Sequence, residues 1–369
     1  MSVWRRDGLI VALVLTLALG TRALARTPQD RKPSDQKQAD AAQAQAQSQE
    51  VQALVRIADA AMTGQQVPSD IPIQVQNDFL KAQASRVWVP VTLTIDPAKV
   101  TTGALTLYLR VAPRGMSAPP EAPPEAKKND KDNKKKDKPD KDNKSAAPAS
   151  LYPFEDVSFL DLKPTAGQPL RITRGLSVPA GAYDLYLVLR ERGTPAPKAG
   201  VLKQPLDVPN YANSEFTTST VLLAERIDTL PAAVTPEQQS EHPYAFGQQE
   251  IVVSPDHKFK KSQELIVLFQ IYNPTITADK KFNLEATYTF YTQGPEGEKR
   301  FNSTEPQSFT PESMKGFDPA AGEQTIQAGQ GVPLQSFPEG TYRLEIKITD
   351  KAASPSKVLT QNVNFTVTS

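Results

Sequence analysis

The strongest constraint on the fold of this chain is an alternation of apolar and polar residues with a period of two. Residues 86–95 carry Val, Val, Val, Leu and Ile at every second position, and residues 105–111, 265–271 and 344–348 repeat the pattern. Successive side chains of a strand point to opposite faces of a sheet, so this spacing predicts strands with one buried face. No long helical periodicity follows Met62. The folded part of the chain is therefore predicted to be all-β.

The alternating runs form two groups, each of about seven strands over roughly 120 to 150 residues, which suits a β-sandwich. In the first group we expect strands near 71–75, 86–95, 105–111, 157–162, 170–176, 183–189 and 202–208, with a further run at 218–224 leading out. In the second group we expect strands near 250–253, 265–272, 282–291, 299–302, 324–327, 342–349 and 358–367. Pro90 has no N–H for a ladder, so its strand is expected at a sheet edge or with a bulge.

A turn motif occurs once in each group. Gly181 and Tyr183 in the first correspond to Gly340 and Tyr342 in the second, and a proline stands two residues before each glycine. Glycine tolerates positive φ just before a strand. The tyrosine ring is expected to point inward and its hydroxyl to reach nearby backbone, as in the tyrosine corner of immunoglobulin-like sandwiches. We predict a structural role for these four residues.

The spacing of the matched segments predicts a tandem duplication with one insertion. The motif repeats 159 positions later, and the strand starting at Leu105 resembles the one starting at Leu284, 179 positions later. Downstream, Val201 to Gln204 resembles Val358 to Gln361 at an offset of 157, which predicts a hairpin loop two residues shorter in the second copy. The change from 179 to 159 places about 20 extra residues within the first copy. Repeats at a fixed period are the signature of duplicated units.

The insertion coincides with a Lys/Asp-rich stretch at about 114–150. Its centre, 127–144, holds nine Lys and five Asp and no apolar side chain except Pro139, which predicts a disordered, solvated loop. An alternative uses Asp130, Asp132 and Asn133 as calcium ligands, but Lys135 stands where an EF-hand loop needs glycine. A nucleic-acid site would need aromatic residues between the charges, and the stretch has none.

The N-terminal residues are typical of a signal peptide. A basic start precedes an apolar run of 13 residues, from Gly8 to Gly20, and Ala23-Leu24-Ala25 suits cleavage before Arg26. About 20 apolar residues are needed to span a bilayer, although an uncleaved anchor stays open as an alternative. Because the chain has no Cys, it cannot carry a thioether-linked lipid. We predict an exported, periplasmic or extracellular protein.

These features divide the chain into five parts: a signal peptide at 1–25, an Ala/Gln-rich disordered segment with a short helix at 26–66, a first sandwich at 67–227, a linker at 228–243 and a second sandwich at 244–369. The short helix is expected over 50–62, ended by Gly64. The linker is predicted from its polar, proline-containing composition.

The first group resembles a known module. The segments VPSDIPIQVQ (67–76), VWVPVTLTID (87–96), VPAGAYDLYLVLRE (178–191) and DVPNYANSEFTTSTVLLA (207–224) are similar to the β-rich C-terminal module of secreted acidobacterial proteins related to the von Willebrand factor A domain. In that family the module follows an A domain, which binds metal through D-x-S-x-S. Here the nearest match, from Asp156 to Leu160, lacks the last Ser, and too few residues precede Val67 to hold an A domain. The resemblance therefore implies a sandwich without metal binding.

The residues with catalytic potential are few. The chain has no Cys and two His, so His242 and His257 are the candidates for imidazole chemistry, and both are expected to be solvated. Ser254, Asp256 and His257 lie together, but adjacent positions in a turn do not aim side chains at one another as a triad requires. The net charge of +1 gives no argument for nucleic acid. We predict no catalytic, cofactor-binding or metal site, hence no enzyme.

Three functions remain open. The leading prediction is an exported, non-enzymatic binding or scaffolding protein of the bacterial envelope, with an envelope protein or polysaccharide as partner. An alternative is a carbohydrate-binding or carbohydrate-active accessory protein, which needs a row of exposed aromatic rings, with Tyr272, Tyr288, Phe290 and Tyr291 as candidates. A third is a secretion or assembly subunit.

Overall fold

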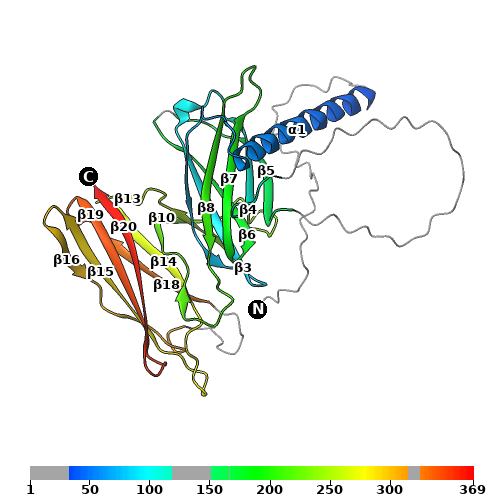
Figure 1. Cartoon of the computed structure of the whole chain (residues 1–369). Helices are drawn as coiled ribbons and strands as arrows, with labels where there is room; N and C mark the ends of the chain where they lie inside the picture. Colours follow the sequence, from blue (N-terminus) through cyan, green and yellow to red (C-terminus); the bar gives the residue numbers. More distant parts are fainter. Residues whose placement is uncertain (1–32, 119–150, 166, 315–324) are drawn as a thin grey trace, which may run out of the picture. The chain divides into compact units, whose positions relative to one another are not determined.

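The computed structural model describes residues 33–118, 151–165, 167–314 and 325–369 (Figure 1). It is built from strands apart from one α-helix and a short 3₁₀ turn, so the predicted all-β sandwich class is confirmed. The predicted signal peptide and most of the charged insertion lie outside the described residues. Residues 54–118 and 152–369 cluster as one unit, to which residues up to 53 do not belong.

Two sheets form the first sandwich, which comprises β1 to β8. One sheet has the order β5-β4-β7-β8, and the other centres on β3, which pairs with β1 and β2 on one side and β6 on the other. The odd-numbered residues of β3, such as Val89 and Leu93, meet Leu107 and Leu187 of the facing sheet in one core. The strands are β1 (Ile73–Asn77), β2 (Leu80–Lys81), β3 (Arg86–Ile95), β4 (Ala104–Pro113), β5 (Phe154–Asp161), β6 (Leu170–Pro179), β7 (Gly181–Glu191) and β8 (Ala199–Val208), with the 3₁₀ turn η1 at Pro97–Lys99.

The second sandwich comprises β9 to β20. One sheet has the order β11-β12-β10-β14-β18 with β9 beside β14, and the other has β13-β20-β19-β15-β16 with β17 beside β15. The core between them is rich in aromatic rings, including Phe269, Phe290, Phe337 and Phe365. The strands are β9 (Thr217–Thr218), β10 (Leu222–Thr229), β11 (Ala245–Phe246), β12 (Gln249–Val253), β13 (Lys258–Lys260), β14 (Glu264–Tyr272), β15 (Leu284–Gly294), β16 (Gly297–Ser303), β17 (Gln307–Phe309), β18 (Ile326–Pro333), β19 (Gly340–Asp350) and β20 (Lys357–Thr368).

The structure moves the predicted boundary between the sandwiches. The predicted first sandwich ends at 227, and the predicted linker spans 228–243. In the structure β9 and β10 pair with β14, so both belong to the second sandwich. The connecting segment is therefore 209–216, and residues 230–244 form a loop between β10 and β11. The sandwich to which a strand belongs is decided by the strands with which it pairs. The polar composition of 228–243 gives no information about that pairing.

The helix α1 (Pro33–Met62) is longer than predicted. The predicted disorder extends to about residue 49, because the segment has few apolar side chains to bury. Ala and Gln are favourable helix formers, however, so the helix continues once its C-terminal turns are packed. Leu54, Ala58 and Met62, four residues apart, are buried, and Gly64 after the last turn has a φ of 71°. No helix of the described residues is long and apolar enough to cross a membrane.

Pro90 lies in the central strand of its sheet and not at an edge. Asn77 of β1 pairs with Val91, and Leu80 of β2 pairs with Trp88, so the neighbouring ladder is interrupted opposite Pro90. At that break the backbone N–H of Asp78 donates to the Pro90 carbonyl at 3.0 Å. The missing N–H is thus accommodated by splitting the partner strand into β1 and β2. The predicted edge position was wrong. The interruption that accommodates Pro90 lies in the neighbouring strand and cannot be predicted from residues 86–95 alone.

Equivalent strands of the two sandwiches share their order and register. The order β5-β4-β7-β8 corresponds to β16-β15-β19-β20. Leu105 pairs with Glu191 and Leu284 with Asp350, so the offsets of 179 and 159 both hold in the ladders. The predicted offset of 157 is wrong: Tyr183 pairs with Leu206 and Tyr342 with Phe365, which extends the offset of 159 across the hairpin. The two hairpins therefore share one register, and the predicted difference of two residues between their loops is absent.

Candidate functional site

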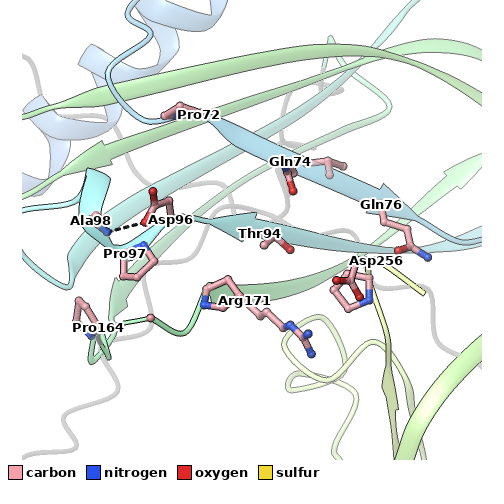
Figure 2. A pocket seen from close by; sticks show the side chains of 14 residues that line it. Pro72, Gln74, Gln76, Thr94, Asp96, Pro97, Ala98, Pro164, Arg171 and Asp256 are labelled. Atoms are coloured by element: carbon pink, nitrogen blue, oxygen red, sulfur yellow. Dashed lines mark hydrogen bonds between the residues drawn. The ribbon is translucent and has the colours of Figure 1, made fainter. Parts of the chain in front are cut away.

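A cleft of about 1060 Å³ lies on the outward face of the sheet formed by β1, β3 and β6. Its floor is a row of three polar side chains, Gln74, Thr94 and Arg171, hereafter the polar row. Gln74 pairs with Thr94 and Thr94 with Arg171, so the ladder register places them side by side on neighbouring strands (Figure 2). Because residues alternate between faces, the flanking Val75, Leu93 and Ile172 point into the core.

Two different segments border the polar row. On one side lie loops of the first sandwich that are rich in proline. On the other side is the turn between β12 and β13, with Pro255 and Asp256, hereafter the wall. The loop residues are Pro72, Pro97, Ala98, Pro164, Gly167 and Pro169. Proline has a fixed φ, so these loops present a rigid apolar rim around a polar floor. Both sandwiches thus contribute to one cleft.

The charged groups of the cleft are held in local interactions. Arg171 Nη1 lies 3.2 Å from Oε1 of Glu225. Asp96 Oδ1 accepts a hydrogen bond from the backbone N–H of Ala98 at 2.9 Å and so caps η1. Asp256 Oδ1 accepts from the backbone N–H of Lys258 at 3.2 Å. The remaining hydrogen-bonding capacity of the floor therefore comes mainly from the amide of Gln74 and the hydroxyl of Thr94.

The candidate triad residues do not converge. The Ser254 hydroxyl donates to Asp256 Oδ1 at 3.3 Å, but His257 turns away: its Nδ1 lies 3.0 Å from the Asn364 carbonyl and its Nε2 lies 3.2 Å from Nε2 of Gln76. Since a carbonyl only accepts, Nδ1 carries the proton and Nε2 accepts from Gln76. Burial lowers the pKa of His257, in contrast to the expected solvated histidine. No group of three or more possible metal ligands occurs in the described residues.

His242 lies apart from this turn. Its Nδ1 is 2.8 Å from Oε1 of Glu250 on β12, and both side chains are partly exposed. It therefore forms a surface contact within the second sandwich and does not approach the polar row.

Hydrogen bonds between side chains and backbone groups connect the two sandwiches; we call this set of contacts the joint. Trp88 Nε1 donates to the carbonyl of Pro243 at 2.9 Å, and the Tyr244 hydroxyl donates to Asp78 Oδ2 at 2.6 Å. The backbone N–H of Lys81 donates to the Tyr272 hydroxyl at 2.9 Å. The joint was not predicted from the sequence, because Pro243 was the last residue of the predicted linker at 228–243 and Tyr244 directly followed it. The sequence signal was a large aromatic residue beside that segment.

The four predicted corner residues lie at equivalent places in the two sandwiches. Gly181 and Gly340 begin β7 and β19 with φ of 155° and 148°, and both tyrosine rings are buried. Tyr342 donates its hydroxyl to the Pro338 carbonyl at 2.7 Å. The Tyr183 ring lies over Gly181, where an added Cβ would be 3.0 Å from its hydroxyl oxygen. The two corners therefore differ in hydrogen bonding.

The predicted aromatic row does not form. Tyr272, Tyr288 and Phe290 are each at most 1% exposed, within the cores. Tyr291 is partly exposed, and its ring lies under the guanidinium of Arg343 at 4.2 Å. These four rings therefore do not make a flat exposed platform for sugars.

No protein-family model and no curated protein matches this chain. Among solved structures, it is similar to the crystal structure of a β-glucuronidase from Bacteroides uniformis, with 9% sequence identity and a TM-score of 0.23. The match covers 79% of this chain and 32% of the enzyme, so this chain spans about a third of the enzyme's length. A similarity this distant carries no argument about function.

Proposed function

We propose that this chain is an exported, non-enzymatic binding or scaffolding protein of the bacterial envelope, built from two immunoglobulin-like sandwiches in tandem and related to the acidobacterial module. The cleft on β1, β3 and β6 is its binding site. The ligand is an extended polar polymer, a segment of an envelope protein or a polysaccharide.

The polar row carries this proposal. Gln74 and Arg171 are exposed and Thr94 is half-buried, so the three side chains present amide, hydroxyl and guanidinium groups to an open cleft. Binding sites combine a few directional polar groups with apolar walls, and here the proline rim supplies the walls. A rigid sheet that holds these groups limits the conformational entropy lost on binding.

The test replaces two members of the row in the full mature chain. Gln74→Ala with Thr94→Val removes the uncharged polar groups and leaves the Arg171–Glu225 pair intact. Gln293→Ala with Thr341→Val is the matched control, because these residues form another cross-strand Gln–Thr pair at exposed positions outside the cleft. Material captured from the host envelope by the unaltered chain is identified, and its binding to all three proteins is measured by calorimetry.

We expect the cleft variant to lose at least tenfold in affinity and the control to bind like the unaltered chain. Protease or glycosidase treatment of the captured material tells the protein ligand from the polysaccharide. Equal binding by both variants would remove the cleft as the site.

A further inference from the structure

The joint contains a buried carboxyl group, that of Asp78. Asp78 follows β1 and is 2% exposed, and its Oδ2 accepts a hydrogen bond from the hydroxyl of Tyr244, itself 3% exposed, at 2.6 Å. Asp78 belongs to the first sandwich and Tyr244 to the second. This hydrogen bond therefore connects the two sandwiches through a group that can gain or lose a proton.

The groups that face Asp78 are uncharged at neutral pH. Tyr244 comes from the segment before β11 and Tyr211 from the segment after β8, and burial together with the nearby Asp78 raises the pKa of the Tyr244 hydroxyl well above its usual value. Within the described residues, no lysine, arginine or histidine forms an ion pair with Asp78. An ionised carboxylate here would be desolvated and supported mainly by one hydroxyl.

Burial raises the pKa of Asp78 to about 6, and the hydrogen bond from Tyr244 offsets only part of that rise. In an opened joint the carboxyl would have the ordinary pKa of about 3.9. The joined form therefore binds the proton more tightly than the opened form. As pH rises through this window the joint loses stability, and the loss is complete above the raised pKa.

The same strand links Asp78 to the cleft. Gln76, two residues before Asp78, lines the cleft and contacts His257, which directly follows Asp256 of the wall. Asp256 and Lys258 are the charged groups beside His257 on its turn, and their side chains lie 3.6 Å apart. Burial lowers the pKa of His257, so protonation of this ring at more acidic pH acts in the opposite direction.

We propose that Asp78 is a proton-sensitive latch of the joint: proton uptake by its carboxyl group holds the wall over the polar row, and ionisation loosens it. This inference concerns regulation of the cleft, and it rests on the proposed function only in taking the cleft to be the binding site. The movement itself is measured without any ligand, so the two proposals fail independently.

The test measures the distance between the sandwiches. Because the chain has no Cys, Lys163→Cys on the rim side and Lys260→Cys beyond the wall give a single pair for spin labels, and both positions are exposed. Pulsed electron paramagnetic resonance then gives the distance distribution of the full mature chain at pH 5 and pH 8. With a raised pKa of about 6, ionisation of Asp78 should by itself lower the ratio of closed to open molecules about tenfold between these values, measured as the difference from the Asp78→Asn variant.

Asp78→Asn is the decisive variant, since asparagine matches the protonated acid in shape and charge. We expect it to keep the pH 5 distribution at pH 8. Asp96→Asn, an exposed carboxyl of the same cleft, should broaden with pH like the unaltered chain. Tyr244→Phe removes the donor to the carboxylate and should broaden more at pH 8.

Because His257 acts in the opposite direction, the readout is broadening of the distribution as the pH rises from 5 to 8. Three outcomes would overturn the latch: an unaltered chain that broadens no more than the Asp78→Asn variant, an Asp78→Asn variant that itself broadens, or one that is broad at both pH values. A circular dichroism spectrum that shows intact strands in each variant separates opening of the joint from unfolding.

Discussion

The hydroxyl of Tyr342 donates to the carbonyl of Pro338, four residues earlier, at 2.7 Å. The hydrogen bond closes the turn that leads into β19, where Gly340 takes a φ of 148°. Tyr183 occupies the equivalent position in β7, but its hydroxyl has no hydrogen-bond partner in the described residues. Comparing the two tyrosines therefore measures how much the hydrogen bond from Tyr342 to Pro338 contributes to stability.

Tyr342→Phe should lower the free energy of unfolding of the second sandwich by about 1 kcal/mol, the usual net contribution of one hydrogen bond. Tyr183→Phe should cost less than half as much, because the hydroxyl it removes forms no hydrogen bond with the part of the chain that the structure describes. Urea denaturation of the two variants tests the difference. Equal losses would show that the hydroxyl of Tyr342 contributes no more than that of Tyr183.

Arg110→Leu should detach the end of α1 from the sheet. The Arg110 side chain is 2% exposed, reaches Asp59 on α1 at 2.5 Å and Glu155 on β5 at 3.0 Å, and lies 4.1 Å from the Tyr152 ring centre. Its loss leaves two carboxylates unpaired, and since both are about one-third exposed we expect a cost of about 2 to 3 kcal/mol. Trypsin cleavage after Arg56 should accelerate.

The control for that experiment is Arg192→Leu. Arg192 pairs with Asp161 at 2.9 Å, but the Asp161 side chain is 82% exposed. Such a surface pair is worth at most about 1 kcal/mol. If trypsin cleaved both leucine variants at the same rate, the Arg110 side chain would not be the contact that holds α1 against the sheet.

Gly175→Ala should disturb the joint through Trp88. A Cβ at Gly175 would lie 2.1 Å from the indole ring, whose Nε1 donates to the Pro243 carbonyl. Displacing the ring should cost about 1 to 3 kcal/mol, as overpacking usually does. Trp88 is the single tryptophan after the predicted cleavage point, so intrinsic fluorescence reports on it directly. We expect a red shift, and none for Gly294→Ala, where nothing lies within 4 Å.

Glu191→Gln should make the free energy of unfolding depend less on pH in the acidic range. Glu191 is fully buried at the end of β7; burial acts to raise its pKa, but backbone N–H groups of Thr101, Lys198 and Thr102 donate to it and lower the pKa below the ordinary value. Its stabilising effect is therefore present above an unfolded pKa of about 4.3 and is lost as pH falls through the lower folded value.

At pH 7 the glutamine variant should lose about 1 to 3 kcal/mol, because its amide NH₂ faces the N–H of Lys198 or of the Thr101 turn. The difference from the unaltered chain should shrink as the pH approaches 3. Melting temperatures at pH 7, 5 and 3 test this, with Glu305→Gln at an exposed position as the charge control. A constant difference at all three pH values would contradict the assigned pKa direction.

Sequence periodicity located the strands well because burial on one face repeats every second residue. The bounds predicted for β3 match the structure, and the motif at Gly181 and Gly340 marks the start of β7 and β19. Short strands such as β2, β11 and β13 were missed, since two or three residues carry no period. The length of the helix was underestimated, because its Ala- and Gln-rich first half favours helix but shows no periodic spacing of large apolar residues.

The cleft and the joint were beyond such reasoning for a different reason. Gln74, Thr94 and Arg171 come from three strands, and their meeting depends on register, which no single segment encodes. Asp78 is buried in the joint, where it accepts a hydrogen bond from Tyr244, 166 positions later. Contacts between distant segments are the part of a fold that local patterns leave undetermined.

The pairing of Val111 with Phe154 brings the two ends of the charged insertion to neighbouring strands of one ladder. Adjacent strands lie about 5 Å apart, so a segment that joins β4 to β5 needs only to have its two ends about that far apart. The hairpin of β4 and β5 is thus a natural graft point, where a reporter domain or an affinity tag with close termini could be exchanged for the native residues without altering the strand alignment on which the core depends.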